Sequence, residues 1–376
     1  MSFYHFRCAV SSSIAMLLCI GFAATAVWSQ NENKEDTVNH RYLVVPFGAY
    51  AEETGLQLGV LGMIFFKSST PDVPGPLFIV SGIATTKGQK TAVLSASANV
   101  FQGWIRLTGL AQYSDWPGKY WAGGNNPSDT AFSYGMTSAR ILGSTLFSAR
   151  FFSPLPAIVQ KDFRAGLQYD FEHNITRVDS PTVGSLPHEL ANTSGNRIGF
   201  GPLLQWDSRD HEGCPSRGLL LSLGKMYYKT MWNSQNNFSK STIDLRSYNT
   251  MPLGLVLALS TLWERADGDV PIDRLSMPDG TTRMRGLTKG RLRDHQQFVL
   301  QSELRIPLSG KFSSVLFADA GKVGPDLSSL VDNRFHYDVG GGFRYSLNSE
   351  RRFNFRIDVS YVDNGVGAAA SFGEAF

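Results

Sequence analysis

The sequence has 376 residues, a formal net charge of +3 and only 18% charged side chains. The small net charge argues against a polyanion-binding protein, and the low charged fraction is unusual for a soluble domain. Aromatic residues make up 12% of the chain and glycines number 37, which suits either a transmembrane β-barrel or a soluble β-sandwich.

The N-terminal segment has the pattern of a secretory signal peptide: a short basic start, an apolar stretch and a polar continuation. We predict a signal peptide over residues 1–29, cut near Ser29, and a short polar tail over residues 30–42. An uncleaved anchor helix is the alternative, because the apolar run is about long enough to span a bilayer. Cleavage would leave Cys214 as a lone cysteine, which excludes a disulfide scaffold.

From residue 43 onward, segments of about ten residues alternate between apolar and polar side chains. Examples are DFRAGLQYDFE (162–172), RIGFGPLLQWD (197–207), QFVLQSELRIP (297–307) and FNFRIDVSYV (353–362). Aromatic residues often end the apolar faces, as expected for the two interfacial girdles of a membrane barrel and less so for a sandwich. We therefore predict an all-β domain over residues 43–376, a transmembrane antiparallel β-barrel of about sixteen strands.

The connectors differ in length. Those near residues 173–194, 207–216 and 264–292 are long, whereas those at 308–311 and 348–351 are short. We expect the long connectors on one side of the barrel and the short ones on the other. The basic run TTRMRGLTKGRLRD (281–294) predicts either a nucleic-acid-binding loop or a loop folded into a polar cavity. Because the basic cluster is confined to one loop, nucleic-acid binding is disfavoured.

Several motifs occur in a specific order along the chain. They are VPFGAYAEETGLQLG, KYWAGGNN, LLQWDSRDHEGCPSRG, RMRGLTKGRLRD, LFADAGKVG, VGGGFRYSLN and SFGEAF. Together they resemble the BamA/TamA (bacterial surface antigen) family of outer-membrane barrels over nearly the whole chain after residue 42. The sequence gives no sign of the periplasmic domains that full-length members carry, and we expect none.

The resemblance implies a role for the basic loop. In the family, an Arg-Gly motif folds back into the lumen, which corresponds to Arg285 and Gly286, and its arginine pairs with acidic groups that correspond to Glu303 and Asp319. A guanidinium offers a fork of donors that carboxylates accept. Alternation places Glu303 on a polar face, but it places Asp319 on the same face as Phe317, so a bulge or a lumenal phenylalanine is required.

Two further positions depart from or complete the family pattern. Leu287 stands where the family prefers an aromatic residue, which weakens the expected packing of the loop. The resemblance implies that Phe372 and Phe376 form a C-terminal signal for barrel assembly. Counting back by two from Phe376 places Glu374 on the lipid-facing side.

The resemblance implies an integral protein of the bacterial outer membrane, related to insertion or translocation factors, with a weakly closed seam between its first and last strands. The alternative is a passive pore or a surface-exposed structural barrel. We expect no enzymatic activity, no metal and no cofactor, because no residue set has the spacing that such chemistry needs. The expected partners are outer-membrane lipid and either unfolded outer-membrane proteins or a separate periplasmic protein, but no nucleic acid.

Overall fold

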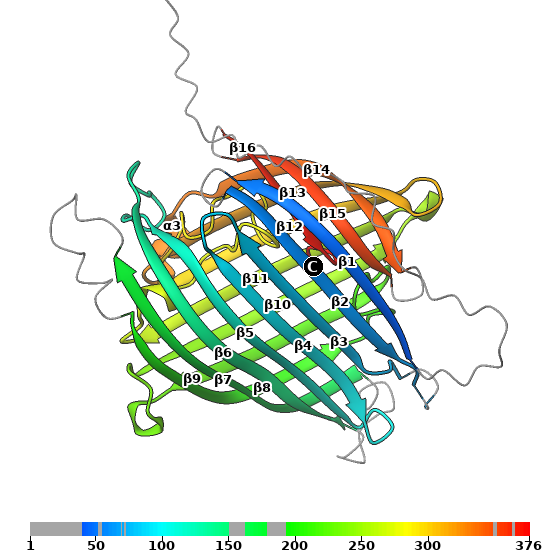
Figure 1. Ribbon diagram of the computed structural model, residues 1–376, viewed down its shortest axis with the longest axis horizontal. Coiled ribbons are helices and arrows are strands. Elements are labelled where there is room, and N and C mark those ends of the chain that lie inside the picture. Colours follow the sequence, from blue (N-terminus) through cyan, green and yellow to red (C-terminus); the bar gives the residue numbers. More distant parts are fainter. Residues whose placement is uncertain are drawn as a thin grey trace, which may run out of the picture.

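The computed structural model describes residues 40–51, 55–68, 70, 73–149, 162–178, 193–348, 352–362 and 365–376. The predicted signal peptide lies outside the described residues. The described chain forms one antiparallel sheet of sixteen strands in sequence order, coiled into a barrel (Figure 1). The predicted fold class and strand number are confirmed. No helix in these ranges is long and apolar enough to cross a membrane.

The first strand begins at His40, ahead of the predicted start at residue 43. The strands are β1 (His40–Ala51), β2 (Gly55–Phe66), β3 (Leu77–Thr85), β4 (Lys90–Val100), β5 (Ile105–Tyr120), β6 (Phe132–Ser148), β7 (Phe163–Val178), β8 (Gly195–Asp207), β9 (Gly218–Tyr228), β10 (Phe238–Thr250), β11 (Val256–Gly268), β12 (Gln296–Pro307), β13 (Phe312–Gly324), β14 (His336–Asn348), β15 (Phe353–Val362) and β16 (Gly365–Phe372). The short helical turns are η2 (Thr230–Trp232), η3 (Pro252–Gly254), η4 (Ile272–Arg274) and α3 (Leu327–Asp332).

Alternation along the strands separates a polar lumen from an apolar outer surface. In β15, Arg356 and Asp358 are buried inside the barrel, whereas Val359 and Tyr361 are about half exposed on the outside. Successive side chains of a strand point to opposite faces, so a period of two yields one face of each kind. The outer face is the one that meets hydrocarbon in a membrane barrel.

The inner face continues through the register into the first strands. Leu61 of β2 pairs with Ser81, Ser81 with Val93, Val93 with Gln112, and Gln112 with Arg140. Directly opposed residues lie on the same face of a sheet, and Arg140 forms a lumenal ion pair. Leu61 therefore lies on the inner face, although its neighbourhood is apolar.

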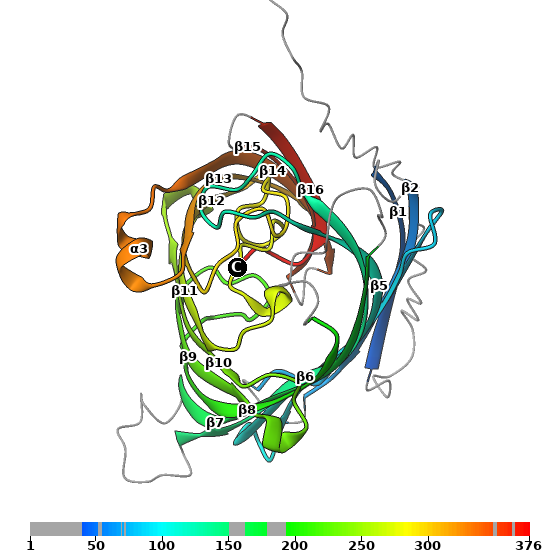
Figure 2. The same cartoon turned by 90° about the vertical axis from the view of Figure 1, so that its left-hand side faces the viewer.

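The two ends of the sheet overlap and are not joined by a ladder of hydrogen bonds. Within the described residues, β1 pairs only with β2, and β16 only with β15. The inner face of β1–β3 packs against outward-facing residues of β14–β16, with Phe47 and Phe372 ring centroids 5.4 Å apart. Figure 2 shows β1 and β2 outside β16. This overlap seam consists of Leu43, Val45, Phe47, Leu61, Met63, Phe65, Leu77 and Ile79 against Leu347, Phe353 and Phe372.

The connector over residues 208–217 lies at the opposite end of the barrel from residues 269–295, because each successive antiparallel strand reverses direction. The prediction that these two long connectors share a side is therefore wrong. The connector turns inward, where Arg305 of β12 donates to the Pro215 carbonyl at 2.9 Å. Asp210 of the connector also forms an ion pair with Arg352, at 2.9 Å.

Asp210 in this connector is partly buried, which by itself raises its pKa. Hydrogen bonds from the Ser216 side chain and from the Ser216 and Arg217 backbone outweigh that effect, and Arg352 adds to them. The pKa of Asp210 is therefore held below its ordinary value. Ionised Asp210 thus stabilises this end of the barrel.

Candidate functional site

Residues 269–295, between β11 and β12, form the inner loop, which folds back inside the barrel (Figure 2). An isolated bridge between Ser276 and Asp294 joins its two arms. Asp279 accepts the backbone N–H groups of Thr281 and Arg283, at 2.7 and 3.1 Å. This side-chain-to-backbone bonding stabilises a tight turn. The turn comes directly before residues 284–286, which reach the barrel wall.

Arg285 lies at the tip of the inner loop and is buried. Its Nη1 is 2.5 Å from Glu303 Oε2 and 3.7 Å from Asp358 Oδ2, and its Nε is 3.7 Å from Asp319 Oδ2. The structure thus brings Arg285 together with both carboxylates proposed from the sequence. Water-excluded ion pairs are strong only when their geometry and partners are complete, so this contact fixes the position of the tip.

Phe317 is a lumenal phenylalanine and there is no bulge beside it. Val315, Phe317 and Asp319 are all buried on the inner face of β13, whereas Leu316 between them is exposed. The Arg285 guanidinium carbon is 3.7 Å from the centroid of the Phe317 ring. A planar cation over an aromatic face is attracted by the ring quadrupole, so Phe317 adds a further contact that holds the arginine in place.

The Arg285 contacts belong to a larger group of charges. Arg344 Nη1 is 2.6 Å from Asp358 Oδ1, and Arg305 Nε is 2.8 Å from Glu303 Oε1. We call this group the lumenal charge cluster: Arg285, Glu303, Arg305, Asp319, Arg344, Arg356, Asp358 and Glu374. Alternation had placed Arg356 and Asp358 on a polar face, but it cannot tell which strands surround the loop.

The backbone of the tip is bonded to the same wall. Met284 N–H donates to Asp319 at 3.2 Å, and Gly286 N–H donates to Asp338 at 2.9 Å. A Cβ on Gly286 would lie 2.2 Å from Ser360 Oγ, and one on Gly367 would lie 2.4 Å from the Gly286 Cα. Glycine is required where two backbones approach so closely, and this approach joins the tip to β16.

Apolar residues of the inner loop pack beside the charges. Leu287 is buried, so the leucine that replaces the expected aromatic residue still serves as a packing contact. It belongs to a cluster with residues from the loop and from β11, β12, β13 and β15: Leu262, Met284, Leu292, Val299, Val323 and Val362. Burial of these side chains stabilises the folded-back position of the loop.

The other arm of the inner loop is bonded to the opposite wall. Arg274 forms ion pairs with Asp170, at 3.2 Å, and with Glu172, both on β7. Arg197 of β8 bridges Glu172 and Asp273 at 3.2 and 2.9 Å. Sequence analysis missed this second contact, although alternation had assigned Asp170 and Glu172 to a polar face. The loop therefore spans the lumen and is held at both sides.

The last four residues also enter the lumen. Gly373 adopts φ 80°, β16 ends at Phe372, and the chain turns inward. Arg344 Nε is 2.9 Å from Glu374 Oε2, and Arg305 donates to the Phe376 carbonyl at 2.8 Å. The prediction that Glu374 faces lipid is wrong, because counting by two assumes that the strand continues past Gly373. Phe372 faces outward in the overlap seam, whereas Phe376 is buried inside.

The side chains of this site hold chain segments in place. Among the described residues, no three His, Cys, Asp or Glu side chains converge as metal ligands. Burial raises the pKa of the Cys214 thiol to about 12, so it is not a ready nucleophile at neutral pH. The arginines and carboxylates bond to one another and to the inner loop.

The profile of the Omp85 superfamily domain matches residues 84–365. The chain belongs to the Omp85 superfamily. It is therefore an outer-membrane β-barrel protein. Among curated proteins, none matches this Omp85 chain significantly.

Solved Omp85 structures share its fold. BamA from Haemophilus ducreyi lacking POTRA domains 1–3 aligns with a TM-score of 0.53 and 14% identity, covering 89% of this chain and 69% of that one. CdiB from Escherichia coli aligns with a TM-score of 0.59 and 10% identity, covering 91% of this chain and 63% of that one. CdiB from Acinetobacter baumannii aligns with a TM-score of 0.53 and 12% identity, covering 89% of this chain and 59% of that one. The chain thus spans less than two thirds of either CdiB.

Proposed function

We propose that this Omp85 barrel promotes the insertion or translocation of other outer-membrane proteins by admitting a client strand at its overlap seam. The observation that carries the proposal is that β1 and β16 each have one edge without a strand partner in the described chain. Unpaired backbone groups in hydrocarbon cost several kcal/mol each, to order of magnitude. A client strand that adds to either edge would satisfy those groups.

The occupied lumen favours this function over a passive pore. The inner loop is held at both walls by Arg274 and Arg285, and the C-terminal residues fill space near Arg305. For a solute to pass through the barrel, the inner loop would have to move out of the lumen. The proposed client is an unfolded outer-membrane protein, delivered directly or by a separate periplasmic partner, and its insertion involves no enzymatic step.

Vesicle reconstitution tests the proposal. The barrel is refolded into lipid vesicles, and the folding of a second, unfolded barrel is timed against vesicles that hold an inert barrel at equal density. We expect clear acceleration. Folding no faster than with the inert barrel would overturn the proposal and leave a passive barrel, which conductance measurements would then characterise.

A seam-locked variant makes the test specific. The rings of Phe47 and Phe372 are 5.4 Å apart, so Phe47→Cys with Phe372→Cys allows a short, cleavable thiol cross-linker to join β1 to β16. We expect the cross-linked barrel to lose the acceleration and the cleaved barrel to regain it. Equal acceleration in both states would show that the seam does not admit the client.

A further inference from the structure

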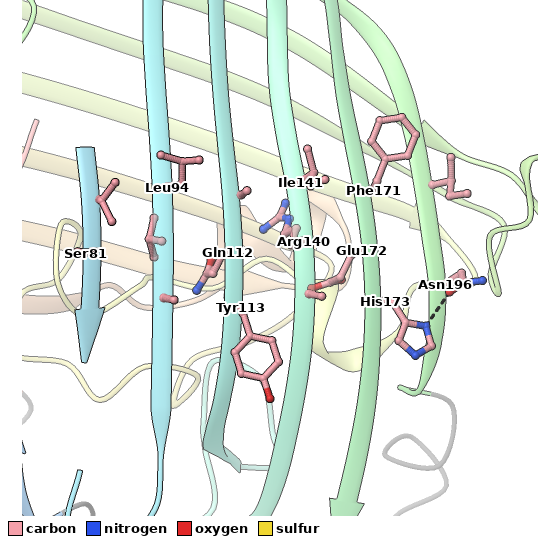
Figure 3. A pocket seen from close by; sticks show the side chains of 16 residues that line it. Ser81, Leu94, Gln112, Tyr113, Arg140, Ile141, Phe171, Glu172, His173 and Asn196 are labelled. Atoms are coloured by element: carbon pink, nitrogen blue, oxygen red, sulfur yellow. Dashed lines mark hydrogen bonds between the residues drawn. The ribbon is translucent and has the colours of Figure 1, made fainter. Parts of the chain in front are cut away.

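A hollow crosses the outer face of the barrel over β3–β8, on the opposite face of β3 from its overlap-seam residues, with a volume of about 700 Å³. Figure 3 shows Leu94, Tyr113, Ile141 and Phe171 among its lining side chains, with the His173–Asn196 hydrogen bond at one end. Two rows of directly paired outward residues run through it. The first is Val80, Leu94, Ala111, Ile141, Phe171 and Ile198, and the second is Ala92, Tyr113, Ala139, His173 and Asn196.

The hollow arises from side-chain size. Most residues of the first row are large and exposed, such as Leu94 and Ile141 at 47% and 55%. In the second row, the small residues Ala92 and Ala139 flank Tyr113. The alanines leave space beside a ridge of branched and aromatic side chains. The resulting hollow has the width of side chains. Its outward-facing lining residues are mostly apolar, which suits a hydrocarbon chain, and the inward-facing Gln112, Arg140 and Glu172 also border it.

A polar ledge borders the second row on the side away from the first. Lys90 lies over the Tyr113 ring at 5.9 Å, and Arg177 pairs with Asp115 at 2.7 Å. Thr137 also donates to Asp115, at 3.0 Å. Two cations therefore face one carboxylate, and the ledge is net positive. An aromatic residue at the boundary between apolar and polar rows marks the membrane interface in barrels of this kind.

We propose that this hollow is a binding site for a phosphate-bearing membrane lipid. One acyl chain lies along Ala92 and Ala139, and the phosphate meets Lys90 and Arg177. The apolar contacts alone would not select a lipid, because neighbouring lipid tails are as apolar as the protein surface. Selection comes from the ledge, because basic residues near the interface attract anionic headgroups.

Native mass spectrometry of the full chain in detergent tests the headgroup preference. The probes are phosphatidylglycerol, which is anionic, and phosphatidylcholine, which is zwitterionic, with identical acyl chains. We expect the anionic lipid to be retained preferentially. Lys90→Gln and Arg177→Gln should each reduce that preference by about fivefold, the effect of one interfacial charge. Equal retention of the two lipids by the unaltered chain would overturn the proposal.

The position of the acyl chain is tested by filling the hollow. Ala92→Leu with Ala139→Leu should abolish retention of the anionic lipid. Ala165→Leu is the matched control, because Ala165 also lies on the outward face, pairing with Phe147 and Leu204, but outside the hollow. All variants should keep the heat-resistant band of the folded barrel. Equal loss in the control, or release of lipid together with conversion of a dimer to a monomer, would refute a lipid site here.

Discussion

Replacing Arg285 with alanine should destabilise the folded barrel by about 3 kcal/mol, at the low end of what removing one partner of a buried ion pair costs. The structure indicates why the low end applies. Glu303 retains Arg305, at 2.8 Å, and Asp358 retains Arg344, at 2.6 Å. Asp319 has no other ion-pair partner among the described residues, although it keeps hydrogen bonds from Gln301 and the Met284 backbone.

Arg283→Ala is the matched control in the same loop. Arg283 is partly exposed and pairs with Asp244, which also has Arg246 at 2.6 Å. Removing a peripheral charge of this kind costs about 1 kcal/mol or less. Unfolding in urea in detergent micelles, followed by the gel-shift of the folded band, measures both variants. Arg285→Ala unfolding like the control would refute the reasoning, and Arg285→Ala with Asp319→Asn should recover part of the loss.

Three other changes test separate contacts. Gly367→Ala should loosen the loop tip, because its Cβ would lie 2.4 Å from the Gly286 Cα; protease cleavage within the inner loop should then appear, and complete protection would contradict the close approach. Asp338→Asn should leave stability unchanged or raise it, because Asp338 lies directly opposite Asp319 and like charges in that position repel; a large loss in urea unfolding would count against this. Asp210 has a folded pKa below its ordinary value of 3.8, so its contribution to the stability of the folded barrel is complete above about pH 4 and is lost as pH falls further. Asp210→Asn should therefore reduce the change in unfolding free energy between about pH 4 and pH 2. An unchanged pH dependence in the variant would disprove the assignment.

Strand positions were predictable from the sequence because lipid and lumen impose opposite chemistry on alternate residues. In β15 this placed Arg356 and Asp358 correctly on the inner face. The pairing of Arg285 with Glu303 and Asp319 came from the family resemblance, since strand alternation carries no information about what a loop contacts. The Arg274 contact on β7 was missed for that same reason.

Two features required three-dimensional information. Side chains alternate between the two faces only as long as the strand continues. β16 ends before Gly373, where the chain turns inward, so Glu374 enters the lumen and does not face the lipid. The first two strands carry apolar residues on both faces, as in GLQLGVLGMIFF, where Leu58 and Val60 are exposed and Leu61 and Met63 are buried. A strand that is apolar on both faces is covered by apolar material on both faces. The sequence does not show that outward residues of β14–β16 cover the inner face of β2.

The overlap seam has a mechanical consequence for the whole barrel. In a cylinder closed by a ladder, the perimeter is fixed by strand number and stagger, and it changes only if a row of bonds breaks. Here the perimeter depends on how far the β1–β3 end extends across the outer face of β14–β16. Apolar side chains that slide past one another exchange similar contacts, and lipid tails replace those that are uncovered. The diameter of the lumen can therefore change while every strand keeps its existing neighbour.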